Sequence, residues 1–288
     1  MTIFMYYIGF DIGGLRVKAA LVENKNIVNS TVEDLPGSFE VLVLVLDKMF
    51  KDLTSGIEAD KISGLGFSFA GALDAKREKM LNSPNIQFLN GQPLKKTLEE
   101  KFKPYLVKIE HDVHCYLIAE KEAGLAKGLK NVFYLTLGTG IGGAFLVDGK
   151  IIFGSHGAAG EAGHMILDIC QELDFEDMAS TKAIRRLLGV DSFKAEDLVR
   201  SGDKRAQEAF RRISEDLGIG LANIINIFDP EAIIIGGGAS WMKEFVLPGA
   251  KKKIEKLVIS PAARKTEILF SEMSRFGGAL GAALLFET

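Results

Sequence analysis

The feature that most constrains the fold is a run of β-forming residues that stops at a cluster of glycines and restarts at once. Residues 132–137 (VFYLTL) lead into GTGIGG at 138–143, and the strand pattern resumes as AFLVDG. We expect a β-hairpin whose tip lets a ligand approach the backbone, because glycine has no Cβ and clustered amides attract anions. For this stretch alone, the alternative is a glycine-rich turn with no ligand.

A second stretch of the same form lies near the N-terminus. Residues 7–11 form a short apolar run that ends on Asp11, and Ile12, Gly13 and Gly14 lead into a further β-forming run at 17–22. A carboxylate beside such a turn can hold Mg²⁺ through water. The alternative is a turn aspartate that satisfies local amides.

The remaining pattern alternates helices and strands. We expect helices at 38–53, 93–103, 113–126, 175–188, 195–228 (broken near Gly202) and 277–286, and strands at 27–32, 62–69, 107–110, 232–235 and 268–271. Two glycine hairpins, each followed by helices and strands, predict an α/β protein with two ribonuclease-H-like domains and an inter-domain cleft. We expect a small N-terminal domain at 1–112, joined by a C-terminal helix at about 275–288, and a large domain at 113–274.

Charge and composition exclude several classes of protein. The formal charge of −3 offers no basic surface for nucleic acid. The first 14 residues are apolar but lack a basic segment and run into a turn, so they predict a strand and no signal peptide. No apolar run approaches the roughly 18 residues that span a membrane. Cys115 and Cys170 are too few for a disulfide framework. We therefore expect a cytoplasmic protein with no nucleic-acid or membrane partner.

Further candidate site residues follow strands or lie in small-residue loops. Asp112 stands between a strand and a helix, where open α/β sheets bind ligands, although it is also a plausible N-cap. Glu161 and His164 lie three residues apart in GSHGAAGEAGHM, and such donor and acceptor pairs bind sugars; a solvated pair is the alternative. Gly236–Gly238 end a buried strand, where either a nucleotide or a plain tight turn fits.

The order of the motifs resembles that of the ROK family, the sugar kinases and sugar-responsive repressors of the actin-like ATPase superfamily. The similarity rests on DIGG at 11–14, GALD at 71–74, NSPN at 82–85, HD at 111–112, LGTGIGGA at 137–144, GEAGHM at 160–165, EDMAS at 176–180 and FDPEAIIIGGG at 228–238. LGTGIGGA followed by GEAGH is specific, whereas DIGG alone is weak. The resemblance covers essentially the whole chain.

The resemblance implies an ATP-dependent hexose kinase that uses Mg²⁺ and acts on the 6-hydroxyl of glucose or of a related or N-acetylated hexose. It implies Asp112 as the general base. The implied sugar-binding residues are Gly71, Asn85, His111, Asp112, Glu161, His164 and Glu176. The implied phosphate and nucleotide residues are Asp11 (near the metal), Gly13, Gly14, Arg16, Gly138, Thr139, Gly140, Gly142, Gly236, Gly237 and Gly238. Homodimers are common in the family.

Three departures from the family pattern leave an alternative open. His111 stands where the family usually has Asn, and Leu15 stands where a Thr usually contacts phosphate, with Arg16 next to it as a possible charge. The cysteine motif that binds structural zinc is absent, so we expect no structural zinc and expect Asp168 or the backbone to hold His164. The alternative function is a non-catalytic sugar-binding sensor without a DNA-binding domain.

Overall fold

The computed structural model describes residues 5–273 and 275–287, and the chain divides into two compact units. Unit 1 comprises the described residues of Met1–Gly128, Phe153–Ala159 and Met273–Thr288, and unit 2 comprises Leu129–Ile152 and Gly160–Glu272. The last residue of the expected C-terminal helix, residue 288, lies outside the described residues.

Unit 1 is built on a mixed sheet with the strand order β3-β2-β1-β4-β7. Strands β1, β2 and β3 pair antiparallel, and β4 and β7 continue the sheet parallel to β1. The strands are β1 (Tyr6–Ile12), β2 (Arg16–Glu23), β3 (Asn26–Asp34), β4 (Ile62–Phe69) and β7 (Leu106–His111). The helices are α1 (Phe39–Leu53), α2 (Leu94–Lys101), α3 (Asp112–Ala123) and α9 (Gly277–Ala283). The segment expected as a loop at 70–74 contains β5 (Ala72–Leu73), which pairs with β6 (Met80–Asn82).

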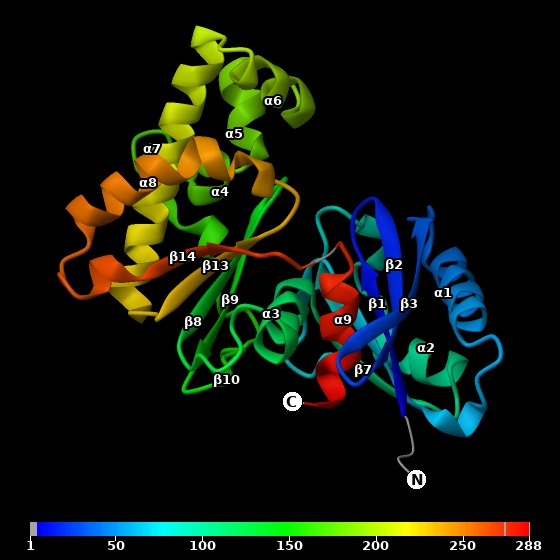
Figure 1. The fold of residues 1–288 in the computed structure, drawn as a ribbon. Coiled ribbons are helices and arrows are strands. Elements are labelled where there is room, and N and C mark those ends of the chain that lie inside the picture. Colours follow the sequence, from blue (N-terminus) through cyan, green and yellow to red (C-terminus); the bar gives the residue numbers. More distant parts are fainter. Residues whose placement is uncertain (1–4, 274, 288) are drawn as a thin grey trace. The chain divides into compact units, whose positions relative to one another are not determined.

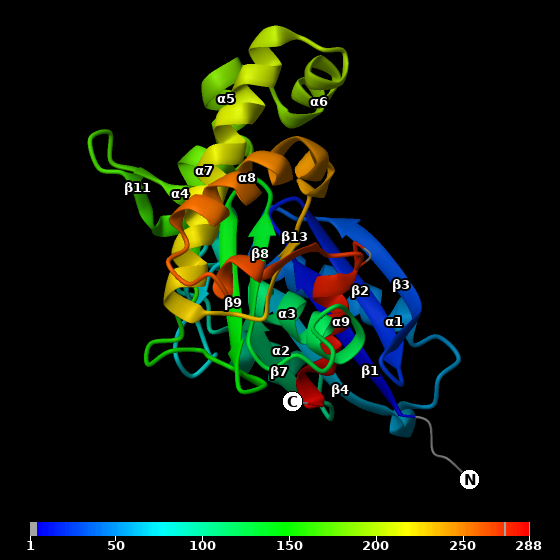
Figure 2. The ribbon, with the colours of Figure 1, turned by 60° about the vertical axis from the view of Figure 1, so that its left-hand side comes forward.

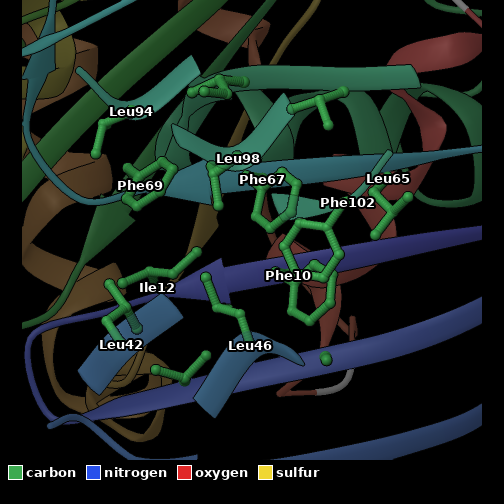
Figure 3. Packing of buried hydrophobic residues seen from close by; sticks show 14 of the residues in the cluster. Phe10, Ile12, Leu42, Leu46, Leu65, Phe67, Phe69, Leu94, Leu98 and Phe102 are labelled. Atoms are coloured by element: carbon green, nitrogen blue, oxygen red, sulfur yellow. The ribbon is translucent and has the colours of Figure 1, made fainter. Parts of the chain in front are cut away.

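The apolar run at 41–46 lies in helix α1, as expected. Its pattern alone fits either a helix or a buried strand. Ser38 accepts a hydrogen bond from the Val41 amide and caps the helix, and Leu42, Leu46 and Met49 are buried. Val41 and Leu44 are exposed on the opposite side. Helix α1 therefore covers the sheet face formed by Phe10, Ile12 and their neighbours, and Figure 3 shows this core from close by.

The aromatic residues of this core come from distant parts of the chain. The rings of Phe10 on β1 and Phe67 on β4 stack with centroids 4.8 Å apart, and Phe102, after α2, lies 5.7 Å from Phe67 (Figure 3). Such pairs contribute about 0.5–1.5 kcal/mol beyond the burial of their area. They fix the register between β1 and β4, and hence the position of Asp11 near the end of β1.

Helix α9 packs against β1 and β4, and α3 packs against α9 (Figure 1). A Cβ on Gly66 of β4 would overlap the carbonyl oxygen of Ala282, so the glycine lets the small-residue helix lie directly on the strand. The compact unit extends to Gly128, beyond the boundary expected after residue 112, because α3 packs on α9 of the same unit.

Unit 2 repeats this strand arrangement in the order β10-β9-β8-β13-β14. Its strands are β8 (Val132–Leu137), β9 (Ile141–Val147), β10 (Lys150–Ile151), β13 (Ala232–Gly236) and β14 (Glu267–Phe270). Antiparallel pairing joins β8, β9 and β10, and parallel pairing joins β8 to β13 and β13 to β14. The same order and direction in both units confirm the expected duplicated ribonuclease-H-like fold.

The helices of unit 2 are α4 (Phe175–Ala179), α5 (Thr181–Leu188), α6 (Ser192–Arg200), α7 (Lys204–Phe228) and α8 (Lys243–Leu257). The single helix expected at 175–188 is broken at Ser180, whose extended backbone ends α4 and whose hydroxyl caps α5. Figure 2 shows the hairpin of β11 (Ile166–Asp168) and β12 (Leu173–Asp174) extending away from the sheet of this unit. Within the described part of the chain, no helix is both long and apolar enough to cross a membrane.

Candidate active site

In unit 1, Asp11 lies opposite Lys18 in the register of β1 and β2. Asp11 Oδ2 accepts hydrogen bonds from Lys18 Nζ at 3.0 Å and from the Tyr116 hydroxyl at 3.2 Å, and Asp11 Oδ1 accepts one from Ser68 Oγ at 3.2 Å. Only 4% of the Asp11 side chain is exposed. Both carboxylate oxygens are therefore engaged by groups of the protein, a network that the sequence motif alone did not indicate.

This arrangement does not favour a magnesium ion bound directly to Asp11. Mg²⁺ usually keeps several waters and takes only one or two carboxylates besides the substrate phosphates, so the expected contact through water or phosphate needs no larger cluster. Across residues 5–273 and 275–287, no group of three or more His, Cys, Asp or Glu side chains could hold a metal ion. A metal ion bound directly to Asp11 would have to displace Lys18, which already balances the charge of this carboxylate.

The first glycine turn brings Gly14 against Asn85. The turn is closed by a hydrogen bond from the Gly13 amide to the Arg16 carbonyl, and a Cβ on Gly14 would lie 3.0 Å from the Asn85 Cβ. Leu15 is 86% exposed. Arg16 Nε lies 3.8 Å from Asp34 on the exposed edge of the sheet. The structure thus groups Gly14 with Asn85 and directs Leu15 to solvent.

Gly71 holds the loop that carries Asn85 in place. It has a φ of +132°, and a Cβ there would lie 2.7 Å from the Asn82 carbonyl oxygen. The Ser83 hydroxyl donates to the Ala70 carbonyl at 2.7 Å. Only glycine permits this approach at low cost, so the GALD and NSPN motifs form one joined structure.

Asp112 is the first residue of α3, directly after β7. Its Oδ1 accepts a hydrogen bond from the Val113 amide at 2.9 Å and lies 3.3 Å from His111 Nε2. The side chain is 26% exposed, so a ligand can reach it. Burial raises the pKa of Asp112 above its usual range and the negative Asp11 adds to this rise, while His111 opposes it. The carboxylate is therefore a stronger proton acceptor than an ordinary aspartate.

A buried ion cluster supports the backbone before Asp112. Glu110 Oε1 accepts from the His111 amide at 2.8 Å and contacts His114 Nδ1 at 3.0 Å, and Arg77 Nε lies 3.0 Å from both Glu110 oxygens. Burial alone would raise the pKa of Glu110, but His114 and Arg77 outweigh it, so the pKa is lowered. The Phe153 ring lies 5.0 Å from the Arg77 guanidinium and closes over the cluster.

In unit 2, the segment after Glu176 holds the tip of the β8–β9 hairpin. The Thr181 amide donates to the Gly138 carbonyl at 3.0 Å, and Ser180 Oγ donates to the Thr139 carbonyl at 3.1 Å. A Cβ on Gly138 would have Gly238 N as its nearest neighbour, at 3.9 Å. The structure thus brings the hairpin tip and the Gly236–Gly238 turn together.

Glu176 and the loop that carries Glu161 and His164 lie against the start of β9. A Cβ on Gly163 would overlap the Ile141 carbonyl oxygen, so the loop that carries Glu161 and His164 lies against this strand. Glu176 Oε2 accepts a hydrogen bond from the Ile141 amide at 2.7 Å. Both Glu161 and His164 are exposed. Glu176 and the loop that carries Glu161 and His164 therefore contact the same short stretch of backbone.

Glu176 also forms an ion pair with Lys182, a residue that lies outside the sequence motifs. The hydrogen bond to Glu176 raises the pKa of Lys182. Lys182 lines a pocket of about 410 Å³, together with Thr139, Thr181, Arg185, Arg186, Asp191 and Ser192. Basic side chains outnumber acidic ones in this lining, which favours an anionic ligand.

His164 is held by a residue other than the one expected. Its Nδ1 lies 3.2 Å from Asp174 Oδ2. Asp168 Oδ1 instead accepts hydrogen bonds from the amides of Cys170 and Gln171, at 2.9 and 3.0 Å, and closes the β11–β12 turn. The expectation that Asp168 or the backbone fixes His164 is therefore corrected to Asp174.

Comparison with known proteins identifies the family. The sequence pattern of the ROK family matches residues 7–288. The chain belongs to the ROK family. Relatives include a glucokinase of Streptomyces coelicolor, 27% identical over 96% of each chain, and an N-acetyl-D-glucosamine kinase of Vibrio parahaemolyticus, 29% identical over 98% of this chain and 99% of the relative. The crystal structure of a ROK-family glucokinase from Streptomyces griseus, in complex with glucose and AMPPNP, is 28% identical to this chain, with a TM-score of 0.81 over 97% of this chain and 98% of that one. These comparisons confirm the actin-like ATPase fold expected from the motifs.

Proposed function

We propose that this ROK-family protein is an ATP-dependent hexose kinase. It transfers the γ-phosphate of ATP to the 6-hydroxyl of glucose or of a related or N-acetylated hexose. The observation that carries the proposal lies in unit 2, where Ile141 adjoins the glycine hairpin and also contacts Glu176 and the loop of Glu161 and His164. The names of the glucokinase and N-acetylglucosamine kinase relatives support the same reaction class.

In this proposal, Asp112 is the general base. Its carboxylate takes the proton of the sugar hydroxyl as the hydroxyl oxygen forms a bond to the γ-phosphorus. The bond from that phosphorus to the oxygen bridging it to the β-phosphate breaks, and ADP leaves with the electron pair. The partial exposure of Asp112 and its raised pKa support this role, because a base must reach the hydroxyl and compete for its proton.

Glu161, His164 and Glu176 bind sugar hydroxyls. Carboxylates accept hydrogen bonds and a neutral imidazole can accept one at one nitrogen, so the set suits a polyhydroxylated ligand. Asn85 and Gly71 contribute the contacts of the NSPN and GALD motifs. His111 takes the place of an amide side chain and gives this chain a different donor beside Asp112.

The donor phosphates bind the glycine turns. The amides near Gly138 and Thr139, and the basic pocket that contains Lys182 and Arg185, provide positive potential for a triphosphate. The turn at Gly13 and Gly14 and the turn at Gly236–Gly238 complete the nucleotide contacts. Mg²⁺ is supplied with ATP in the proposed reaction.

A cytoplasmic location, where ATP and reduced thiols are available, belongs to the same proposal, and Cys115 and Cys170 are both free.

A coupled ADP-release assay with MgATP tests the proposal against glucose, mannose, fructose, N-acetylglucosamine and N-acetylmannosamine. We expect turnover that requires both a hexose and ATP, with a clear preference for one sugar. The absence of turnover on every sugar would contradict the kinase function. If a sugar still bound by calorimetry in that case, the protein would be a sugar-binding sensor.

A further inference from the structure

We propose that Asp174 is a positioning residue that fixes the tautomer of His164, so that His164 Nε2 accepts a hydrogen bond from a sugar hydroxyl. This inference rests on the proposed function for its substrate, but its structural part concerns two residues of one unit. Asp174 ends β12 and lies ten residues after His164, in a hairpin that no recognised motif covers.

The two oxygens of Asp174 have separate partners. Oδ1 accepts a hydrogen bond from the Asp177 amide at 2.8 Å and caps α4, while Oδ2 lies 3.2 Å from His164 Nδ1. The next residue, Phe175, donates its amide to the Met165 carbonyl at 2.8 Å, which joins the backbone beside Asp174 to that beside His164. The carboxylate is thus anchored by the helix and by this backbone contact.

The burial of the two side chains shows which of them is the fixed partner. The Asp174 side chain is 19% exposed and the His164 side chain is 69% exposed. An imidazole so open to solvent has few packing contacts that would fix its ring. The hydrogen bond from the anchored carboxylate therefore sets the orientation of the ring.

The chemistry of the pair decides the tautomer. An ionised carboxylate only accepts hydrogen bonds, so Nδ1 must carry the hydrogen that joins it to Asp174. In the neutral imidazole, Nε2 then has a free lone pair. At this position the protein therefore accepts a hydrogen bond from the sugar, and a ligand group without a hydroxyl hydrogen is disfavoured there.

Asp174→Asn separates this role from helix capping. Asn caps helices about as well as Asp, so α4 keeps its first turn. The Asn amide can turn its NH₂ group toward Nδ1, which allows the opposite tautomer with hydrogen on Nε2. The matched control is Asp203→Asn, because Asp203 also caps a helix of unit 2, with Oδ1 accepting from the Ala206 amide at 2.8 Å.

The first readout is the ¹⁵N spectrum of the histidine rings in the full-length protein, at alkaline pH, where free imidazole is neutral. His164→Gln assigns the resonances. We expect wild type and Asp203→Asn to show His164 mainly as the Nδ1–H tautomer, and Asp174→Asn to shift it toward Nε2–H. A wild-type protein in the Nε2–H form, or an Asp174→Asn spectrum identical to wild type, would overturn the inference.

The second readout is kinetic. Asp174→Asn should raise the KM for the sugar by about 3- to 10-fold, the loss of about one hydrogen bond, while kcat changes by less than about twofold. Asp203→Asn should change neither. An unchanged KM for Asp174→Asn would remove the positioning role. If wild type turned over no sugar, the proposed function would fail, and the ring spectrum would still test the pair.

Discussion

Lys18 Nζ lies 3.0 Å from Asp11 Oδ2, from the position directly opposite on the neighbouring strand. Asp11 is the carboxylate of the first glycine turn, and its surroundings already neutralise its charge. Lys18 belongs to none of the sequence motifs. It lies beside Asp11 because β1 and β2 pair in this register.

Lys18→Met should destabilise the protein, because it leaves the Asp11 charge buried with only hydroxyl partners. Breaking a buried pair costs about 3–5 kcal/mol, and the partial exposure of Lys18 reduces this to about 2–3 kcal/mol. The melting temperature should fall by about 4–10 °C. Lys25→Met, which removes a more exposed partner of Glu122, serves as the control and should have a clearly smaller effect. Equal shifts for both variants would contradict the assignment.

His111→Asn should move the acid limb of the kcat profile to higher pH. His111 lowers the pKa of Asp112, so its loss should raise that pKa further. The reaction needs the carboxylate, which is present above this pKa and is lost as the pH falls through it. The measurement is kcat against pH for both proteins, with His156→Asn as the control. A limb that stays in place or moves to lower pH would count against the pairing of His111 with Asp112.

Gly140→Ala should weaken sugar binding through Glu176. The new Cβ would overlap Glu176 Oε2, so the carboxylate must leave the Ile141 amide. We expect the KM for the sugar to rise by about 3- to 10-fold. The control is Gly138→Ala, because the nearest atom to its new methyl group, Gly238 N, lies 3.9 Å away. This variant should keep a sugar KM near that of wild type. An equal sugar KM in both variants would show that sugar binding does not depend on the hydrogen bond between Glu176 and the Ile141 amide.

Asp216→Asn should stabilise the protein near neutral pH. Burial raises the pKa of Asp216, on α7, to about 6. Ionisation of this group therefore costs the folded state stability. The stability that the folded state keeps while Asp216 is protonated is fully present below the unfolded pKa of about 3.9. It is lost as the pH rises through about 6, where Asp216 ionises in the folded protein. The gain at neutral pH should be about 1–2 kcal/mol, since the side chain is only partly buried.

The prediction for Asp216→Asn is checked by measuring the melting temperatures of wild type and variant at neutral pH and at about pH 4. The lower pH is near the pKa of an aspartate in the unfolded chain. The difference between the two proteins should be largest at neutral pH and should shrink toward acid. Asp197→Asn, at an exposed site on α6, should show no such trend. A gain that is equal at both pH values would reject burial as its cause.

The sequence predicted those parts of the fold that depend on local pattern. The strand runs at 7–11 and 132–137 and the glycine turns after them appear as expected, because runs of β-forming residues and glycine placement are local signals. The break at Ser180 was not predicted, since its cause is a hydrogen bond to Thr139, far away in the sequence. The short β5–β6 pair likewise depends on the contact of Gly71 with Asn82.

The candidate site was predictable as a set of motif residues but not as a set of contacts. Motif spacing pointed to Asp112, Glu161 and His164. The partners that set their chemistry, such as Glu110 beneath His111 and Asp174 beside His164, arise from tertiary packing. Glu110 lies in β7 and His114 in α3, so the spacing of four between them is not a helical one, and their contact next to the base depends on the strand-to-helix turn.

Asp112 is tested most directly by single-turnover phosphoryl transfer in wild type and Asp112→Asn, with the enzyme in excess over ATP and the preferred hexose saturating. We expect the sugar affinity of Asp112→Asn, measured by calorimetry, to stay within a fewfold of that of wild type. The rate of the chemical step should fall by about 10²- to 10⁴-fold, the usual effect of losing a general base. An Asp112→Asn protein that binds sugar normally and transfers phosphate at the wild-type rate would contradict Asp112 as the base.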